Sequence, residues 1–317
     1  MKRHHRPYLW SLACVLLLAG AAFLMPSMRT SAPARPQTPV LPLPYAVEQL
    51  GFDNAGSAIR LSGTLTLPRG PGPHPAIVLI PGSGEVDRDG TLSGHQFYLV
   101  LADHLTRQGF AVLRSDKRGL GKSGGDFAAA ATTFDFASDI EAALAFLRKR
   151  PGIDAGRLGL VGHSEGALVG TIVAARDPAL AFLVLMAGNG VPMGELLKGR
   201  GAPPQDPASA GPWMRTLLSI DPRPLLRQVR CPVLALAGKK DRVVAADANV
   251  PALAQALAAN PRAEVHRLPG LNHFFQTAGS GEFAEVADIA ETMSPRALAL
   301  IGEWSRRQAM PPAPDRR

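Results

Sequence analysis

Five residues in the middle of the chain, Gly162 to Gly166, spell Gly-His-Ser-Glu-Gly and place a serine between two glycines at G-x-S-x-G spacing. An apolar run precedes them and an Ala/Val/Leu/Ile segment follows, so we expect a strand, a sharp turn and a helix. The glycines leave room where a Cβ would collide with neighbouring backbone. Such a turn lifts the hydroxyl of Ser164 above the sheet at a helix N-terminus, where negative charge is stabilised. The expected chemistry is nucleophilic attack by Ser164.

A serine hydroxyl is a weak nucleophile unless a neighbouring base takes its proton. The sequence offers an acid and a histidine in the required chain order, because Asp241 and His273 each come shortly after a strand-like run. Taken alone, His273 has an ordinary explanation as a loop histidine and Asp241 as a turn or cap residue, with Asp247 as a competing acid. Taken together with Ser164, they predict a Ser-His-Asp triad at one edge of the sheet.

A glycine-rich loop at residues 81–90 follows the first buried strand and is the candidate for a second part of the site. Acyl transfer creates an oxyanion that needs backbone N–H donors. Small side chains permit close approach of the backbone, so we assign one donor to the N–H of Ser83, with Gly84 as the alternative. The second donor is the N–H of Glu165. The charged residues 87–89 are expected to brace the loop through ion pairs rather than to bind substrate.

Apolar strands that alternate with helices must position these residues. The strand expected at 59–67 alternates apolar and polar side chains, whereas the later strands are continuous apolar runs. Continuous apolar strands separated by helices predict an α/β fold with a mostly parallel central sheet and helices on both faces. The later strands are expected at 76–80, 111–114, 158–161, 182–186, 233–237 and 264–268, and the helices at 96–108, 134–150, 165–176, 250–259 and 295–308.

The alternation is interrupted at residues 189–230, which are rich in Gly and Pro at 199–212 and then carry apolar side chains. We interpret this segment as a short cap inserted over the carboxyl edge of the sheet, where a substrate pocket gains its roof. Trp213 from the cap, with Phe274 and Leu120 from loops, are candidates for the apolar wall of the pocket. Simple packing is the competing explanation for each of the three.

Five short segments share their pattern with a known family: Gly82-Ser83-Gly84, Asp87-Arg88-Asp89-Gly90, Asp116 through Ser123, Gly162-His163-Ser164-Glu165-Gly166 and Leu271 through Gln276. With them the chain resembles the α/β-hydrolase superfamily over residues 59–308, and in particular bacterial carboxylesterases related to serine aminopeptidase-like and dienelactone hydrolase-like enzymes. The resemblance implies the α/β-hydrolase fold and an esterase without metal or cofactor, with Ser164, Asp241 and His273 as the triad. The cap is short for the lidded members, which argues against long acyl chains.

Residues 119–124 spell G-x-G-x-x-G, so a dinucleotide-binding oxidoreductase is the rival enzyme class. That fingerprint opens directly into a helix in the first βα turn. Here residues 124–126 continue the loop instead. The region also mimics the end of a phosphate-binding loop, but Asp116 stands where that pattern requires its first glycine. We therefore expect Arg118 and the glycines to shape a tight loop.

The 317 residues carry a formal net charge of +8, which raises the question of nucleic-acid binding. The surplus lies in residues 1–35 and 306–317, so residues 36–305 are formally neutral. The body of the chain therefore shows no sign of binding a polyanion. The eight histidines include no H-E-x-x-H spacing, so no metal site is expected.

Lys2, Arg3 and Arg6 precede an uncharged apolar run at residues 8–25. This pattern predicts a signal peptide or an N-terminal membrane anchor over residues 1–26. Positive charge ahead of the run places the body outside the cytoplasm, as a periplasmic, secreted or membrane-anchored protein. The divisions expected after it are an extended Pro-rich linker, poor in hydrogen bonds, at 27–44, a hydrolase domain at 45–310 and a basic tail at 311–317.

The function predicted from these features is that of a serine hydrolase that cleaves small carboxylic esters, of short to medium acyl chains, through an acyl-enzyme on Ser164. A peptidase or amidase on the same fold is the nearest alternative. A noncatalytic binding protein is another, because a fold does not by itself confer function. The residues leave the natural substrate, cleavage of the leader and the oligomeric state open.

Overall fold

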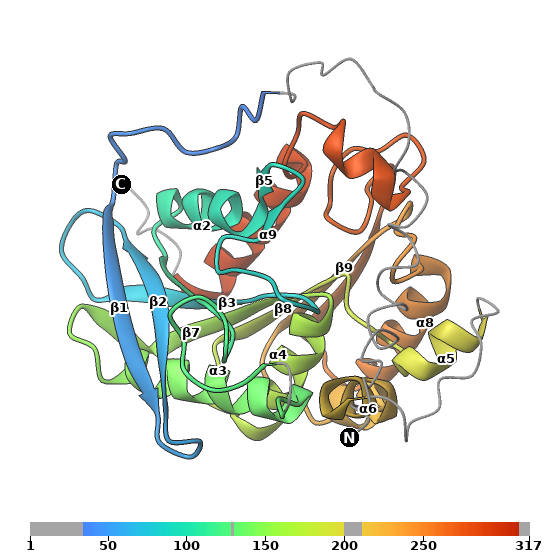
Figure 1. Cartoon of the computed structure of the whole chain (residues 1–317), viewed down its shortest axis with the longest axis horizontal. Coiled ribbons are helices and arrows are strands. Elements are labelled where there is room, and N and C mark those ends of the chain that lie inside the picture. The colour runs from blue at the N-terminus through green and yellow to red at the C-terminus, as the bar shows by residue number, and fades with distance from the viewer. Residues whose placement is uncertain (1–33, 128–129, 200–210, 311–317) are drawn as a thin grey trace, which may run out of the picture.

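The computed structural model describes residues 34–127, 130–199 and 211–310, and its centre is one eight-stranded sheet (Figure 1). The strand order is β1-β2-β6-β3-β7-β8-β9-β10. β1 pairs with β2 and β2 with β6 antiparallel, whereas all the other pairs are parallel. The bounds are β1 Ala46–Asn54, β2 Ile59–Leu67, β3 His74–Ile80, β6 Ala111–Ser115, β7 Ile153–His163, β8 Phe182–Met186, β9 Val233–Gly238 and β10 Ala263–Leu268. The predicted mostly parallel sheet is confirmed.

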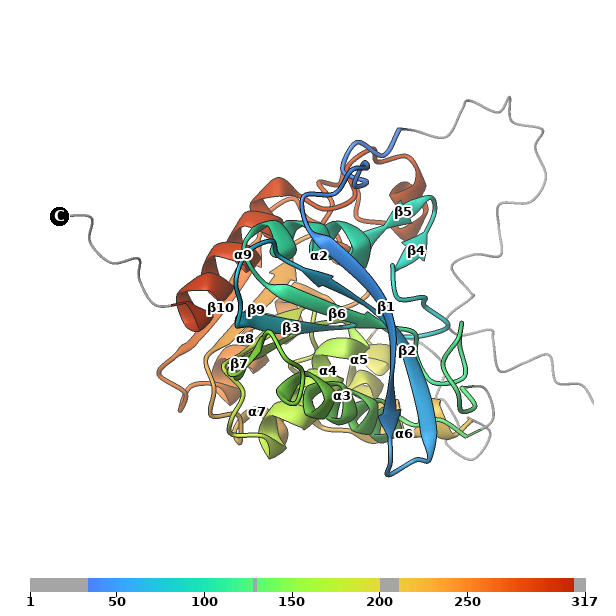
Figure 2. The same ribbon diagram turned by 90° about the vertical axis from the view of Figure 1, so that its left-hand side faces the viewer.

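Helices cover both faces of this sheet, as Figures 1 and 2 show. α2 (Phe97–Arg107) and α9 (Pro295–Ala309) pack on one face, and α3 (Thr133–Arg148), α4 (Glu165–Arg176) and α8 (Ala246–Ala256) pack on the other. Successive side chains of a strand point to opposite faces, so Ile77 of β3 joins one apolar core while Val78 joins the other. Burial on both faces explains why the central strands are continuous apolar runs. A small hairpin of β4 (Thr91–Leu92) and β5 (His95–Gln96) and the short helix η1 (Phe283–Ala287) lie in the connections.

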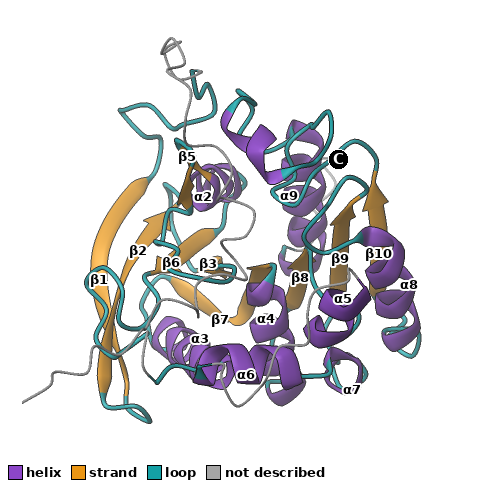
Figure 3. Ribbon diagram, turned by 45° about the vertical axis from the view of Figure 1, so that its right-hand side comes forward, coloured by secondary structure: helices purple, strands orange, loops and turns teal. Residues whose placement is uncertain are grey.

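The described part of the segment expected to form the cap contains three short helices between β8 and β9 (Figure 3). They are α5 (Met193–Gly199), α6 (Pro212–Ser219) and α7 (Pro222–Leu226), and residues 200–210 lie outside the described part of the chain. α6 packs against α3, and α7 packs against α4 and α8. Leu217 and Leu226 are buried in the core on that side of the sheet. The described part of the segment therefore extends the helical layer next to the start of α4.

The described part of the Pro-rich linker, residues 34–44, is held by hydrogen bonds rather than poor in them, which corrects the sequence-based expectation. Arg35 donates to the backbone oxygens of Ser93, Ala287 and Ile289 at 2.6–2.8 Å. The side chain of Gln37 bonds the backbone of Met293 and Thr292 through both its amide nitrogen and its oxygen. Two long polar side chains can thus dock a segment whose prolines contribute no N–H donors.

The predicted leader at residues 1–26 and tail at 311–317 lie outside the described residues. Within the described ranges, none of the helices combines the length and apolarity needed to cross a bilayer.

Candidate active site

Ser164 occupies a strained turn between the end of β7 and the start of α4. Its backbone angles are φ 56° and ψ −120°, a left-handed conformation that a serine adopts only under constraint from its surroundings. The two glycines of the motif are required by close backbone contacts. A Cβ on Gly162 would lie 2.1 Å from the oxygen of Gly166, and one on Gly166 would lie 2.2 Å from the oxygen of Ile80. The turn therefore forms as the motif predicts, with Ser164 at the N-terminus of α4.

Asp241 and His273 meet at the carboxyl edge of the sheet, from the loops that follow β9 and β10. The Nδ1 of His273 lies 2.8 Å from Oδ2 of Asp241 and donates to it, because an ionised carboxylate only accepts. The other oxygen of Asp241 accepts from the backbone N–H groups of Val243 and Val244, both at 2.7 Å. In the neutral ring this arrangement leaves Nε2 of His273 as the proton acceptor, the tautomer that a general base needs.

The charge state of Asp241 follows from the same contacts. Burial by itself raises the pKa of Asp241, but the His273 ring and the two backbone donors outweigh burial and hold this pKa below its ordinary value. Asp247, the competing acid, has a side chain that is 89% exposed and pairs with Arg267 at 2.6 Å. The structure therefore selects Asp241 as the partner of His273.

The remaining contact of the expected triad is the one between Ser164 and His273. Among the hydrogen bonds of the described residues, none joins the hydroxyl of Ser164 to His273. Both residues are 6% exposed, and the ring of His273 lies 4.7 Å from that of His163, the neighbour of Ser164. Catalytic hydrogen bonds are often long or poorly aligned before substrate binds, so this arrangement is compatible with a triad.

A buried chain of hydrogen bonds connects the three loops of the site. The N–H of Gly82 donates to the hydroxyl of Tyr98 at 2.9 Å, and that hydroxyl lies 3.2 Å from Nδ1 of His163. The Nε2 of His163 lies 2.9 Å from the backbone oxygen of His273. A carbonyl oxygen only accepts, so Nε2 of His163 carries the proton and Tyr98 donates to Nδ1. Burial, reinforced by the neighbouring His273, lowers the pKa of His163 to about 3, so this ring is neutral at physiological pH.

A pH-dependent stability follows from the neutral state of His163. Its pKa is lower in the folded chain than the ordinary value of about 6.5, so the unfolded chain binds the extra proton first as pH falls. The stabilisation is complete above pH 6.5 and is lost as pH falls from there towards 3. In urea unfolding, we expect the wild-type chain to lose about 2 kcal/mol more than His163→Gln between pH 7 and pH 5. Equal losses in the two proteins would show that His163 is protonated in the folded state.

The expected oxyanion donors lie beside Ser164. A Cβ on Gly82 would be 3.3 Å from Cβ of Ser164, so the glycine-rich loop is in contact with the nucleophile. Within the described residues, the backbone N–H groups of Ser83, Gly84 and Glu165 donate to no other protein group. The N–H of Glu165 is also one of the unpaired donors at the start of α4. These groups remain free to bind an oxyanion, and the choice between Ser83 and Gly84 stays open.

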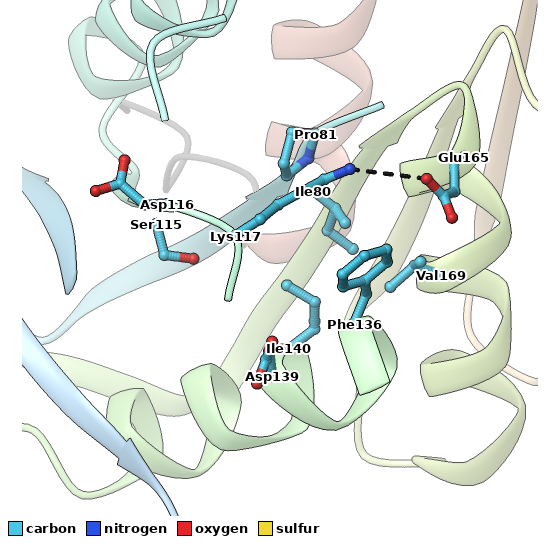
Figure 4. A pocket seen from close by; sticks show the side chains of 10 residues that line it. All are labelled: Ile80, Pro81, Ser115, Asp116, Lys117, Phe136, Asp139, Ile140, Glu165 and Val169. Carbon is cyan, nitrogen blue, oxygen red and sulfur yellow. Dashed lines mark ion pairs between the residues drawn. The ribbon is translucent and has the colours of Figure 1, made fainter. Parts of the chain in front are cut away.

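A buried ion pair that the sequence did not reveal lies behind this loop (Figure 4). Lys117 and Glu165 extend towards each other, and their charged atoms are 3.7 Å apart. Burial lowers the pKa of Lys117, and the Glu165 carboxylate opposes that shift. The other oxygen of Glu165 accepts from Trp213 Nε1 at 2.7 Å and from Thr133 Oγ1 at 3.1 Å. The only hint in the sequence was that Lys117 follows a buried strand.

A small cavity adjoins this ion pair. Its volume is about 20 Å³, enough for one water molecule. Its wall is formed by residues from α3, α4 and the carboxyl ends of β3 and β6 with the residues that follow them: Ile80, Pro81, Ser115, Asp116, Lys117, Phe136, Asp139, Ile140, Glu165 and Val169. None of these is Ser164, Asp241 or His273, so the cavity lies behind the site and is not its substrate pocket.

Two of the three expected pocket residues contact Glu165 or His273. Trp213 contacts Glu165 directly. Phe274 stacks on Phe97 at 4.7 Å between ring centres and lies 5.3 Å from the ring of His273. Leu120 instead belongs to a turn, where its backbone bonds Lys117 and Ser123. Among the described contacts, none connects Leu120 to the triad.

Two aromatic residues near Phe274 were missed. Phe97 opens α2, and Phe283 of η1 lies 6.0 Å from the Phe274 ring by ring centres. Phe283 is 38% exposed, which is unusual for so large an apolar side chain. No motif marks either residue, because only the folded chain brings α2 and η1 together.

The charged loops brace the site in the way that the sequence suggested. Arg88 bonds Asp116 through its Nε at 2.9 Å, and Asp89 pairs with Arg114. Arg118 bonds Asp139 at 2.8 Å and is buried with it. The glycine-rich run at 119–124 packs on the Asp116 carboxylate, since the N–H of Lys122 donates to it at 3.2 Å, and this supports a structural role over phosphate binding. Within the described ranges, no cluster of His, Cys, Asp or Glu could hold a metal ion.

The chain is similar to known hydrolases in sequence and in structure. Residues 86–204 match the family model described as serine aminopeptidase, S33. Esterase EstD of Thermotoga maritima is 31% identical over 157 residues, which are 49% of this chain and 37% of that protein. The chain thus spans little more than a third of the length of this relative.

The similar solved structures extend over most of the chain. The Pyrococcus furiosus esterase Pf2001 superposes with a TM-score of 0.60 at 18% identity, over 84% of this chain and 93% of the other. Est1E from Butyrivibrio proteoclasticus, solved with bound ferulic acid, superposes with a TM-score of 0.60 at 20% identity, over 81% of this chain and 96% of the other. At these identities the likeness establishes the fold.

Proposed function

Because the chain has the α/β-hydrolase fold, we propose that it is a serine hydrolase that cleaves carboxylic esters through an acyl-enzyme on Ser164. The observation that carries the proposal is the hydrogen bond from His273 to the buried Asp241, beside a serine held in a strained turn at a helix N-terminus. The sequence similarity to an esterase and to the serine aminopeptidase model supports the same class of chemistry.

In the proposed reaction, Nε2 of His273 removes the proton from Ser164 while Oγ attacks the ester carbonyl. Asp241 keeps the ring in the tautomer that can accept this proton and stabilises its charged form. The N–H groups of Glu165 and of Ser83 or Gly84 bind the oxyanion. His273 then gives the proton to the leaving alcohol. Water, activated by the same ring, releases the acid and restores Ser164.

The apolar wall of the ester site is assigned to Trp213 and Phe274, with the segment at 189–230 as a short cap. The preference for short to medium acyl chains rests on this short segment. The leader at 1–26 is assigned to export or to membrane attachment, which would place the domain outside the cytoplasm. The substrate is a small ester molecule.

The test is hydrolysis of p-nitrophenyl esters from acetate to laurate, beside the matching p-nitroanilides. We expect kcat/KM for the butyrate ester to exceed that for the laurate ester by at least about tenfold, because each methylene that the pocket cannot accommodate forfeits binding energy. Matching anilides should be turned over more slowly than the esters. Faster hydrolysis of an anilide than of its matched ester would favour the amidase or peptidase alternative. The similarity to the serine aminopeptidase model is the reason for including this comparison.

A further inference from the structure

The ammonium group of Lys117 is bonded to the loop that carries the proposed oxyanion donor. Its Nζ donates to the backbone oxygen of Gly82 and, at 3.2 Å, to that of Gly84. The Gly82 oxygen and the Ser83 N–H belong to the same planar peptide unit, on opposite sides of one partial double bond. A positive charge at the oxygen therefore draws electron density from the nitrogen and makes the Ser83 N–H a stronger donor.

The counter-charge of Lys117 comes from the residue that supplies the other proposed donor. Glu165 is 1% exposed, and among the described residues its Oε2 has no hydrogen-bond partner apart from the ion pair with Lys117. Its Oε1 is fixed by Trp213 and Thr133. The carboxylate thus faces Lys117 in a defined orientation, and the backbone N–H of Glu165 follows Ser164 at the start of α4. One ion pair connects the two sides of the oxyanion site.

Two aromatic rings also lie near the ammonium group of Lys117. Its Nζ lies 4.8 Å from the ring centre of Phe136 and 5.6 Å from that of Phe127. Rings in these positions can stabilise a cation but accept no ordinary hydrogen bond. The two loop carbonyls and Glu165 are therefore the polar partners that the described structure gives to the ammonium. Such a low-dielectric setting strengthens each of these interactions.

We propose that Lys117 is a positioning residue that orients and polarises the Gly82–Ser83 peptide for oxyanion binding, with Glu165 as its counter-charge. The proposal rests on the proposed function, and it chooses Ser83 over Gly84 as the first donor. Lys117 is expected to stabilise the transition state more than the bound substrate, because a neutral ester carbonyl binds the polarised N–H only weakly.

The single change Lys117→Met leaves Glu165 buried without its counter-charge and is expected to impair folding. The test therefore uses the neutral pair Lys117→Met with Glu165→Gln, since glutamine still accepts from Trp213 and Thr133. For p-nitrophenyl butyrate we expect kcat to fall by about tenfold, less than the 10²–10³-fold loss that follows removal of an oxyanion donor itself. KM should change by less than about twofold, which marks an interaction made only in the transition state.

Two ketone inhibitors separate this role from a merely structural one. An alkyl trifluoromethyl ketone forms an oxyanion adduct with a serine, whereas the methyl ketone of the same length binds only as a ground-state analogue. We expect the double variant to bind the first about tenfold more weakly and the second unchanged. Lys122→Met, an exposed lysine on the same loop, is the matched control and should behave as the wild type in all these measurements.

Wild-type kcat and trifluoromethyl ketone affinity in the double variant would overturn the proposal. Equal weakening of both ketones, or a double variant that does not fold, would also overturn it, since either result assigns the pair to general support of the loop. Failure of the proposed function is distinguishable, because it would appear as unchanged ester turnover in Ser164→Ala.

Discussion

Replacing Ser164 by alanine is expected to lower kcat for p-nitrophenyl butyrate by about 10⁶-fold while leaving the fold intact. Loss of a serine nucleophile or its histidine base removes the whole covalent pathway, and only binding and oxyanion stabilisation remain. Alanine should fit the turn as serine does, because it keeps the Cβ that lies next to Gly82. The measurement is steady-state hydrolysis, with near-ultraviolet circular dichroism to verify tertiary structure.

The covalent step has a direct readout. Acid-quenched wild-type protein mixed with substrate should carry the acyl mass on the peptide that contains Ser164, and the alanine variant should carry none. Ser219→Ala, on the exposed end of α6, is the matched control and should retain wild-type turnover. If Ser164→Ala hydrolyses the ester within tenfold of the wild-type rate, Ser164 is not the nucleophile.

Asp241→Asn should lower kcat by about 10⁴-fold with little change in KM. The carboxylate accepts the proton of His273 Nδ1, whereas an amide can present its NH₂ group there and stabilise the ring with Nε2 protonated. In that tautomer His273 cannot remove the Ser164 proton. A pH series provides a second readout. The lowered pKa of Asp241 gives stability that is complete above its unfolded-state pKa and lost as pH falls, and this acid-side loss should be smaller in the variant.

Asp247→Asn is the control for this experiment, because Asp247 is the nearby acid that pairs with Arg267 at the surface. Its kcat should stay within about twofold of the wild type, since an exposed ion pair contributes little. A larger loss from Asp247→Asn than from Asp241→Asn would contradict the assignment of the triad acid.

Patterns local in the chain predicted most of the sheet. The runs at residues 76–80, 111–114, 182–186 and 233–237 all lie within observed strands, because strands buried on both faces need apolar side chains at every position. The edge strand β1 was not predicted. Its residues are mostly exposed or partly buried, apart from the buried Phe52 and Asn54, and it pairs with β2 along its whole length. A strand stabilised mainly by its partner has a weaker sequence signal.

The site shows the same division between local and long-range information. The turn around Ser164 could be predicted because its glycines satisfy contacts within a few residues and with one adjacent strand. The hydrogen bonds of Arg35 span up to 254 residues of sequence, so the linker could only be misjudged from its prolines. Leu120 stays a prediction as a pocket residue, because apolar character alone does not tell in which direction a loop residue faces.

The amino-acid sequence by itself determined the α/β class, the strained nucleophile turn and the chain order of serine, acid and histidine. These depend on short-range periodicity and on steric rules for glycine, which act within one or two elements. Only the tertiary structure decided between Asp241 and Asp247, connected Gly82 to His273 through Tyr98 and His163, and placed Lys117 against Glu165. Those contacts join residues from different loops, and their distances are set by the packing of the whole sheet with its helices.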